Sequence, residues 1–471
     1  MGEGRDGGGP IIQHDLYRAP LTLGSALGLR GPQVISAYGA GGKTTILNRL
    51  AAELAASGQK AILTTTTKIY PPAGIPLVLA DDPARAAEAL CRALQATRIV
   101  SLGRQLLSDG KLEGVDPGWM ELLWQETGAS LLVEADGAAG KPVKGYNENE
   151  PVLPGSSHLI IAVTGLDALG VRLSPQEVHR PELLAGSAGA RLNSALTAAQ
   201  LARHLHYMLR RGRSQASAAR AVAVFNKMDL AGHPGGAARE LAALMKGTAV
   251  DRLLFTAAAE RAPVYFCYRP EGEAFKPAVA AVVLAAGGAT RMGADKLQLE
   301  YRGRTILEHT LDQICKAGLQ QVIVVTRPGS PWRQRLAGYE CSIVENPDSD
   351  SGIASSLKTG LMAVDGAAQA VCFALGDQPL IPAEVYHRLA EEHRQDLPLA
   401  TVPLWKGRRG NPVLFDRRTW PLLLTLKGDR GGSQALPQLP PDQIKYVELS
   451  CPEIIFDVDT PADYRKLGSV P

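Results

Sequence analysis

The stretch that decides the fold of the second half of the chain is VVLAAGGATRMGADK, at Val282–Lys296. It overlaps an apolar run, Val279–Leu284, that ends in small residues, a pattern that predicts a buried parallel strand followed by a tight turn. Small residues let backbone N–H groups approach phosphate oxygens, while Arg291 supplies a planar fork of donors and Lys296 a mobile charge. The stretch therefore predicts a polyphosphate site, although a surface turn with two solvated cations would share its composition.

This loop closely resembles the signature loop of the MobA/MocA-like nucleotidyltransferases, which wraps a nucleoside triphosphate. Its Ala-Ala-Gly version resembles molybdenum cofactor cytidylyltransferases, whereas the guanylyl branch usually has glycine in place of Ala286. The resemblance therefore implies CTP, rather than GTP, as the substrate of this half. Two serines at a predicted helix start resemble the nucleotide-side loop, and plain N-cap serines are the alternative. The nucleotide-binding residues implied are Leu284, Ala285, Ala286, Gly287, Gly288, Arg291, Lys296, Ser355 and Ser356.

Length and composition set broad limits. A chain of 471 residues exceeds what one hydrophobic core usually supports, so at least two domains are expected. The net charge of +3 gives no field that would favour nucleic acid as a partner. Six scattered cysteines without a CxxC pair argue against a zinc site or a disulfide framework and fit a reducing cytoplasm. No apolar run approaches the length of a membrane span, and we expect residues 1–20 to be a disordered tail.

The first half contains a second phosphate loop. The predicted strand Val34–Tyr38 leads into Gly39–Thr45, GAGGKTT, and then into a helix with one apolar face. In this P-loop form glycine N–H groups surround a phosphate, Lys43 reaches the outer phosphates and the Thr44 hydroxyl ligates magnesium. Ala37 stands where GxxxxGK[ST] has its first glycine, and a plain strand-to-helix turn is the alternative. The predicted nucleotide-binding residues here are Gly39, Gly41, Gly42, Lys43, Thr44 and Thr45.

An acidic strand end supports nucleotide binding by the first half. The predicted strand Leu131–Val133 is followed by Glu134 and Asp136, and period-2 geometry places both carboxylates on one side. An acid at this place can hold magnesium through water. We assign Asp136, together with Thr44, to this metal.

A short element later in the first half resembles a base-recognition motif. The apolar strand predicted at Ala221–Phe225 ends in Asn226-Lys227-Met228-Asp229, which resembles the NKxD element of P-loop GTPases. An aspartate accepts two donors from the guanine edge, so the element favours GTP over ATP. Asn226, Lys227 and Asp229 are therefore predicted base contacts, with Asp229 as a helix cap the alternative.

The first half also resembles the selenium-dependent hydroxylase accessory proteins (YqeC-like) over about Leu21–Leu230. The resemblance rests on the strings at Gly39–Thr45, Thr64–Ile69 and Glu134–Pro151. It implies a role in maturing molybdenum hydroxylases, with an apo-hydroxylase as a partner. The hydroxyls of Thr64–Thr67 either face the nucleotide or form a strand end. Four loop residues face either a ligand or solvent: Lys141, Lys144, Asn147 and Glu148.

The domain boundary is predicted in the Pro- and Glu-rich stretch Arg269–Pro277. The fold class is α/β, in two domains. The first is a YqeC-like P-loop accessory domain at 21–268, with a P-loop NTPase-like parallel sheet. The second, after a linker at 269–277, is a MobA-like NTP transferase domain at 278–471, with a mostly parallel, Rossmann-like sheet.

Two aspartates of the second half are predicted to hold magnesium. Asp377 follows the predicted strand Ala370–Leu375, where the carboxyl ends of parallel strands place ligands. The family resemblance gives Asp459 as the second metal ligand. Period-2 geometry after the apolar Ile454–Phe456 puts Asp457 on the same side as Asp459, and a helix start with a Thr460 cap also fits this segment.

Together these residues predict a cytidylyltransferase fused to a nucleotide-binding accessory domain. The acceptor implied by the resemblance is molybdenum-loaded molybdopterin, bound beside the arginine- and glycine-rich segments Arg408–Val413 and Gly428–Gly432, which would also suit solvent. Its phosphate would attack the α-phosphorus of CTP and expel pyrophosphate, with Arg291, Lys296 and Asp377 as catalytic residues. A nucleotidyltransferase for a sugar or polyol phosphate, and a non-catalytic GTP-switched insertion factor, remain as alternatives.

Overall fold

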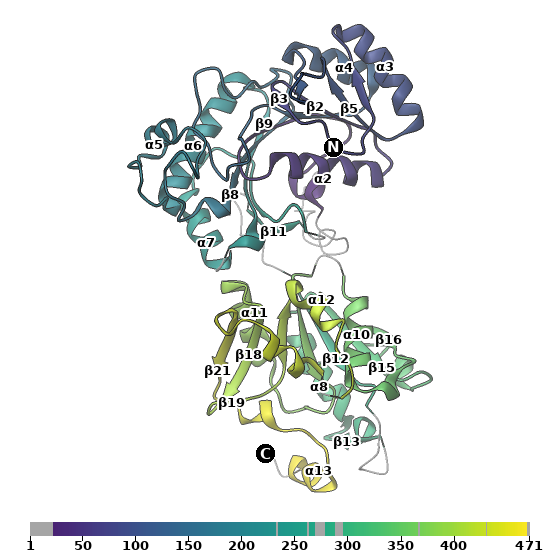
Figure 1. Cartoon of the computed structure of the whole chain (residues 1–471). Coiled ribbons are helices and arrows are strands. Elements are labelled where there is room, and N and C mark those ends of the chain that lie inside the picture. The colour runs from purple at the N-terminus through teal and green to yellow at the C-terminus, as the bar shows by residue number, and fades with distance from the viewer. Residues whose placement is uncertain are drawn as a thin grey trace, which may run out of the picture. The chain divides into compact units, whose positions relative to one another are not determined.

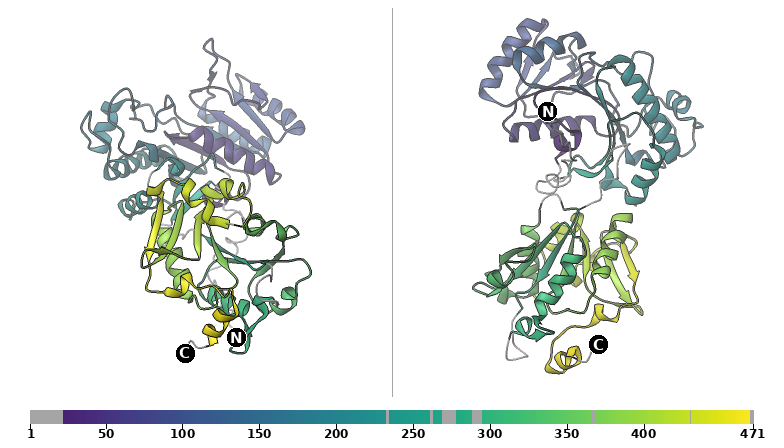
Figure 2. Two further views of the ribbon diagram at one scale, coloured as in Figure 1. Left: turned by 60° about the horizontal axis from the view of Figure 1, so that its bottom comes forward. Right: turned by 180° about the vertical axis from the view of Figure 1, so that it is seen from behind.

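The computed structural model describes residues 22–231, 234–260, 263–268, 278–287, 295–365, 368–429 and 431–468. These residues form two compact units, which we call the N-terminal unit (22–268) and the C-terminal unit (278–468) (Figures 1 and 2). The predicted tail and linker lie outside the described residues, as do Gly288, Arg291 and Arg430. Among the described helices none is both long and apolar enough to cross a membrane.

The N-terminal unit is built on a nine-stranded sheet in the order β11-β10-β9-β8-β1-β7-β2-β5-β4. Every neighbouring pair is parallel except β10 and β11. The strands are β1 (Val34–Gly39), β2 (Ala61–Thr65), β4 (Leu77–Leu79), β5 (Ile99–Gly103), β7 (Ser130–Glu134), β8 (Leu159–Gly165), β9 (Arg220–Asn226), β10 (Arg252–Thr256) and β11 (Val264–Tyr268). A separate ribbon pairs β3 (Lys68–Ile69) with β6 (Leu112–Glu113).

Helices cover both faces of this sheet, which is why its central strands are apolar on both sides. The helices are α1 (Leu23–Leu27), α2 (Lys43–Ala56), α3 (Pro83–Ala96), α4 (Met120–Thr127), α5 (Pro181–Ala188), α6 (Ala198–Gln215) and α7 (Pro234–Leu244). Alternate residues of β1 enter different cores, because Ile35 packs with α1 and α2 while Val34 packs with α3 and α4. The strand order puts the end of β1 between β7 and β8, with Ala37 opposite Glu134 and Gly39 opposite Val163.

The C-terminal unit has an eight-stranded sheet in the order β16-β15-β12-β17-β20-β18-β19, with β21 also paired to β18. The four strands from β16 to β17 are parallel, whereas β20 runs antiparallel to both of its neighbours. The sheet is therefore mixed, with a parallel half. The strands are β12 (Val279–Leu284), β15 (Gln321–Thr326), β16 (Ser342–Glu345), β17 (Ala370–Leu375), β18 (Ala400–Trp405), β19 (Arg408–Arg409), β20 (Val413–Asp416) and β21 (Ile444–Glu448).

Two helical layers cover this sheet as well. Leu307 and Leu389 pack against one face and Leu357 and Leu423 against the other, in separate apolar cores. The helices are α8 (Ile306–Lys316), α9 (Trp332–Arg335), α10 (Ile353–Ala363), α11 (Ala383–Asp396), α12 (Trp420–Leu423) and α13 (Pro461–Gly468), and a small ribbon pairs β13 (Glu300–Tyr301) with β14 (Arg304–Thr305). Because β12 and β17 are parallel neighbours, the residues that follow them meet at one edge.

Candidate functional site

The edge beyond β12 and β17 gathers the predicted transferase residues. Asp377 follows β17, and the Gly376 N–H donates to Leu284 O at the end of β12 across 3.1 Å. Lys296, at the start of a 3-10 turn capped by the Asp295 carboxylate, extends its ammonium group into the same place. Strand pairing thus holds the end of β12, where the predicted nucleotide loop begins, and the first acidic residue at one edge.

Lys296 joins two aspartates that are distant in the sequence. Its Nζ lies 2.6 Å from Asp459 Oδ1 and also contacts the Asp377 carboxylate. Burial lowers the pKa of Lys296, but Asp377 and Asp459 outweigh burial and raise that pKa above its ordinary value. The structure therefore brings together three of the predicted site residues, with the ammonium group between two carboxylates.

The route by which Asp459 arrives differs from the prediction. The apolar Ile454–Phe456 forms no strand, because residues Pro452–Ile455 make a 3-10 turn and irregular chain follows. An apolar run of three residues is too short to indicate a strand rather than a turn. The helix start is confirmed: Thr460 Oγ1 accepts from Asp463 N at 3.2 Å, and the Thr460 N–H donates to the Asp463 carboxylate at 3.0 Å.

Asp457 and Gln378 also belong to this site, although neither was assigned to it from the sequence. Gln378 Nε2 donates to Asp457 Oδ1 across 2.6 Å. Burial, followed by the charges of Asp377 and Asp459, raises the pKa of Asp457 to about 6. The period-2 relation of Asp457 to Asp459 was the signal in the sequence, whereas nothing there pairs Asp457 with Gln378.

Among the described residues of the C-terminal unit, the other predicted nucleotide contacts except Gly287 are engaged with protein groups. The Ala286 side chain is 2% exposed and packs in the apolar core, while Ala286 O accepts from Arg327 Nε at 3.0 Å. Ala285 N donates to the backbone of β15, and Gly287 is exposed. The hydroxyls of Ser355 and Ser356 lie 2.8 and 3.0 Å from Asn346 Nδ2, so they hold the start of α10.

In the N-terminal unit, three glycines form the loop between β1 and α2. Gly39, Gly41 and Gly42 have φ values of 112°, 85° and 118°, which L side chains rarely adopt. A Cβ at these positions would lie 2.1 Å from Val163 O, 2.2 Å from Gly165 N and 2.4 Å from Asn226 Nδ2 respectively. The glycine spacing is thus required by backbone conformation and by close packing.

Lys43 is turned inward from the start of α2. Its Nζ donates to Gly39 O at 2.7 Å and lies 3.1 Å from Asp136 Oδ1 and 3.6 Å from Glu134 Oε1. The Asp136 carboxylate accepts the Gly39 N–H at 2.9 and 3.1 Å and pairs with the buried Lys144 at 3.2 Å. Asp136 therefore stabilises the loop through Gly39 and Lys43.

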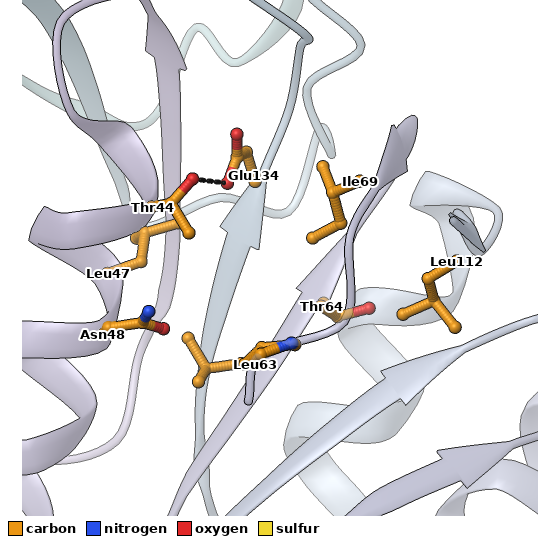
Figure 3. A pocket seen from close by; sticks show the side chains of 9 residues that line it. Thr44, Leu47, Asn48, Leu63, Thr64, Ile69, Leu112 and Glu134 are labelled. Atoms are coloured by element: carbon orange, nitrogen blue, oxygen red, sulfur yellow. Dashed lines mark hydrogen bonds between the residues drawn. The ribbon is translucent and has the colours of Figure 1, made fainter. Parts of the chain in front are cut away.

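Glu134, rather than Asp136, faces the Thr44 hydroxyl. Thr44 Oγ1 donates to Glu134 Oε2 across 2.8 Å. Burial raises the pKa of Glu134, although Lys43 and Thr44 act to lower it. Figure 3 shows both side chains at a pocket whose remaining lining is mostly apolar. That lining consists of Leu47, Asn48, Leu63, Thr64, Ile69, Pro72 and Leu112.

The residues of the NKxD element have different surroundings: Asn226 contacts the glycine loop, and Asp229 lies on the surface. Asn226 Nδ2 donates to Gly41 O at 2.9 Å, and Asn226 Oδ1 accepts from Thr256 Oγ1 at 2.9 Å. Lys227 Nζ pairs with Asp167 at 2.6 Å, and Asp229 is exposed on a 3-10 turn. Asn226 thus holds the glycine loop between β1 and α2. Thr45 is exposed on the first turn of α2.

Hydrogen bonds show the partners of several residues whose roles the sequence left open. The hydroxyls of Thr64, Thr65 and Thr66 donate to backbone carbonyls at 3.0, 2.8 and 2.7 Å, so these residues build the strand end. Lys144 faces neither a ligand nor solvent: it is 1% exposed and pairs with Asp136 and, at 2.9 Å, with Glu150. The segment that carries Lys144 is consequently tied, through Asp136, to the glycine loop between β1 and α2.

Comparison with known proteins adds two families. Residues 35–182 match the YqeC protein family, and residues 281–443 match the MobA-like NTP transferase domain family. The chain is 39% identical over 151 residues to an uncharacterized protein, YqeC, of Escherichia coli, covering 32% of this chain and 58% of that protein. It is 28% identical over 189 residues to the molybdenum cofactor cytidylyltransferase of Escherichia coli, and the match covers 40% of this chain and 94% of that protein. It is 32% identical over 202 residues to nicotine blue oxidoreductase of Paenarthrobacter nicotinovorans, and the match covers 40% of this chain and 96% of that protein.

The chain belongs to the MobA-like NTP transferases and carries a YqeC domain before the transferase domain. We therefore call the C-terminal unit the MobA-like domain and the N-terminal unit the YqeC domain. The family makes this chain a nucleotidyltransferase. The two relatives of the MobA-like domain differ in their named activities, so the acceptor does not follow from the family.

The donor atoms of the MobA-like domain fit a divalent cation. Asp377 Oδ1 is buried and has no hydrogen-bond partner among the described residues. Carboxylate oxygens are the ligands that magnesium prefers, usually one or two together with substrate phosphates. Nowhere in the described part of the chain do three His, Cys, Asp or Glu side chains form a metal cluster, so phosphates of a substrate would have to complete the coordination.

Proposed function

We propose that the MobA-like domain transfers a cytidylyl group from CTP to molybdenum-loaded molybdopterin and releases pyrophosphate. The observation that carries the proposal is the convergence of Lys296, Asp377 and Asp459 beyond β12, where the stretch that resembles the family's signature loop begins. The choice of base and acceptor is supported by the likeness to a molybdenum cofactor cytidylyltransferase, of which this chain covers 94%.

In this proposal the chain supplies alignment and charge. Asp377 and Asp459 would hold magnesium, which when bound neutralises the charge of the phosphates. Lys296, and Arg291 outside the described residues, would add positive charge beside the triphosphate. The acceptor phosphate is already ionised at neutral pH, so no side chain has to remove a proton from it. Catalysis then consists of orientation and electrostatic stabilisation.

For the YqeC domain we propose binding of GTP with magnesium, in support of molybdenum hydroxylase maturation and with an apo-hydroxylase as partner. The glycine loop, Lys43 and the Thr44 hydroxyl support a phosphate site at the N-terminus of α2, where no side chain caps the helix. The contact of Thr44 with Glu134 favours Glu134 as the metal-side acid, with Asp136 bracing the loop. We place the domains at 21–268 and 278–471.

The test of the transferase proposal is pyrophosphate release by the full chain with CTP, GTP or ATP, each with and without molybdenum cofactor. We expect release with CTP that depends on both magnesium and the cofactor. Release with CTP and a sugar or polyol phosphate, but not with molybdopterin, would move the assignment to another acceptor. No release under any condition would favour a non-catalytic insertion factor.

A further inference from the structure

Irregular chain delivers Asp459 to Asp377, so specific contacts must hold the two segments together. The Val458 N–H donates to Asp377 O across 3.2 Å, and the Val458 side chain is fully buried in a small apolar cluster. Asp457 and Asp459, on either side of Val458, bond instead to Gln378 and Lys296 at the site. Gln378 adds a side-chain bond, from its Nε2 to Asp457 Oδ1 at 2.6 Å.

Gln378 suits this task by its burial and by its lack of charge. Its side chain is almost fully buried, at 2% exposure, so its orientation is fixed by packing. Asp457 precedes Asp459 by two residues and bonds to Gln378, the residue after Asp377, so it lies beside both proposed ligands. A neutral amide donor satisfies the Asp457 carboxylate without adding another charge, whereas a glutamate at 378 would set two carboxylates against each other.

We infer that Gln378 is a positioning residue: by holding Asp457, it keeps Asp459 at the distance from Asp377 at which both carboxylates bind one divalent cation. The inference rests on the proposed metal role of Asp377 and Asp459. Asp457 is held by the amide and does not itself touch the cation. Loss of such a supporting contact typically weakens metal binding by about 10- to 100-fold.

The experiment measures Mn²⁺ that the full chain binds only when CTP is present, by electron paramagnetic resonance of free Mn²⁺, beside a thermal melt. Gln378→Met keeps the side-chain size and removes the donor, so the dissociation constant for Mn²⁺ should rise about 10- to 100-fold. Asp457→Ala removes the acceptor of the same hydrogen bond and should raise the dissociation constant for Mn²⁺ equally. This variant tests the inference if Gln378→Met does not fold. Asp457→Asn keeps the acceptor oxygen and should stay within about threefold of wild type.

Gln369→Met is the matched control. Gln369 is also buried, lies at the opposite end of β17 and directs its Nε2 toward the Asp416 carboxylate at 3.5 Å. Its loss should leave CTP-dependent Mn²⁺ binding unchanged. Unchanged binding in Gln378→Met, or equal weakening in Gln369→Met, would overturn the inference. Equal weakening in Asp457→Asn and Asp457→Ala would do so too, because Asp457 would then be a ligand.

The same titration separates this inference from the proposed metal site. Asp377→Asn should abolish CTP-dependent Mn²⁺ binding if the site is correct. An unaffected Asp377→Asn would contradict the proposed metal site, whereas an affected Asp377→Asn with an unaffected Gln378→Met would contradict only the positioning role.

Discussion

Lys296 Nζ lies 2.6 Å from Asp459 Oδ1, a contact that joins the end of the nucleotide loop to a carboxylate near the C-terminus. Asp377 shares the same ammonium group. Two carboxylates at such a place repel each other unless a cation lies between them, and here the chain provides that cation itself. If Asp377 and Asp459 held a divalent cation, Lys296 would be able to contact the phosphates of the nucleotide instead of these oxygens.

The first prediction concerns the two carboxylates. Asp377→Asn and Asp459→Asn keep size and remove one charge, so magnesium-dependent turnover should fall by about 10²-fold or more, the scale of one preorganised electrostatic contact. The measurement is turnover across a magnesium titration, with a thermal melt to show that the fold survives. Near-normal turnover in both variants would disprove the metal assignment.

A second prediction separates the two acids of the YqeC domain. Glu134→Gln should weaken the magnesium dependence of GTP binding, because its carboxylate faces the Thr44 hydroxyl. Asp136→Asn should instead lower the melting temperature, because Asp136 accepts the Gly39 N–H and pairs with two buried lysines. Fluorescent GTP titrations with and without magnesium measure the first effect. The opposite assignment of effects would restore Asp136 as the metal-side acid.

Lys43 gives the third prediction. Lys43→Ala should abolish GTP binding by the YqeC domain, since Lys43 is the cationic residue of the loop Gly39–Thr45 and in the P-loop form would reach the outer phosphates. Lys60→Ala, at an exposed position before β2, is the matched control and should bind GTP as wild type does. Binding of GTP by Lys43→Ala at the wild-type affinity would end the P-loop hypothesis, and a preference for ATP would refute the guanine assignment.

The fourth prediction is a pH dependence of stability in the MobA-like domain. Burial of Asp416 would raise its pKa, but Arg418 and His393 outweigh burial and lower that pKa from 3.8 to about 2. A carboxyl whose folded pKa is depressed stabilises the fold above its unfolded pKa, and this stability is lost as pH falls from about 4 toward 2. The loss should be about 2 kcal/mol, and urea unfolding across this range, with Asp416→Asn beside wild type, measures it.

Much of the sheet framework could be predicted because buried parallel strands are short apolar runs that end in small or acidic residues. The runs at Val279–Leu284 and Ala370–Leu375 match β12 and β17. Their parallel pairing then places Asp377 at the edge where the loop begins. The antiparallel β20 has no comparable signal, because an apolar run does not show which way its strand lies in the sheet.

Long-range side-chain partners could not be predicted. The pattern put Glu134 and Asp136 on one side of a strand end, but only the structure shows that Glu134 faces Thr44 while Asp136 accepts the Gly39 N–H. The bond between Gln378 and Asp457 likewise depends on how irregular chain returns to the sheet. Residue spacing gives the side of a strand and not the partner that another segment brings to it.

Base choice gives the fifth prediction. The Ala286 methyl packs in the core and the Ala286 carbonyl is held by Arg327, so an effect of Ala286 on base choice would act through the backbone of the loop. Ala286→Gly would free that backbone and should narrow the difference between CTP and GTP in kcat/KM. An unchanged ratio would show that base choice lies elsewhere.

The central claim is cytidylyl transfer to molybdopterin, and the most direct measurement is the mass of the product. The full chain would be incubated with magnesium, molybdenum-loaded molybdopterin and equal concentrations of CTP and GTP. The account predicts that molybdopterin cytosine dinucleotide is the main product. A predominance of the guanine dinucleotide, or the absence of any dinucleotide, would contradict it.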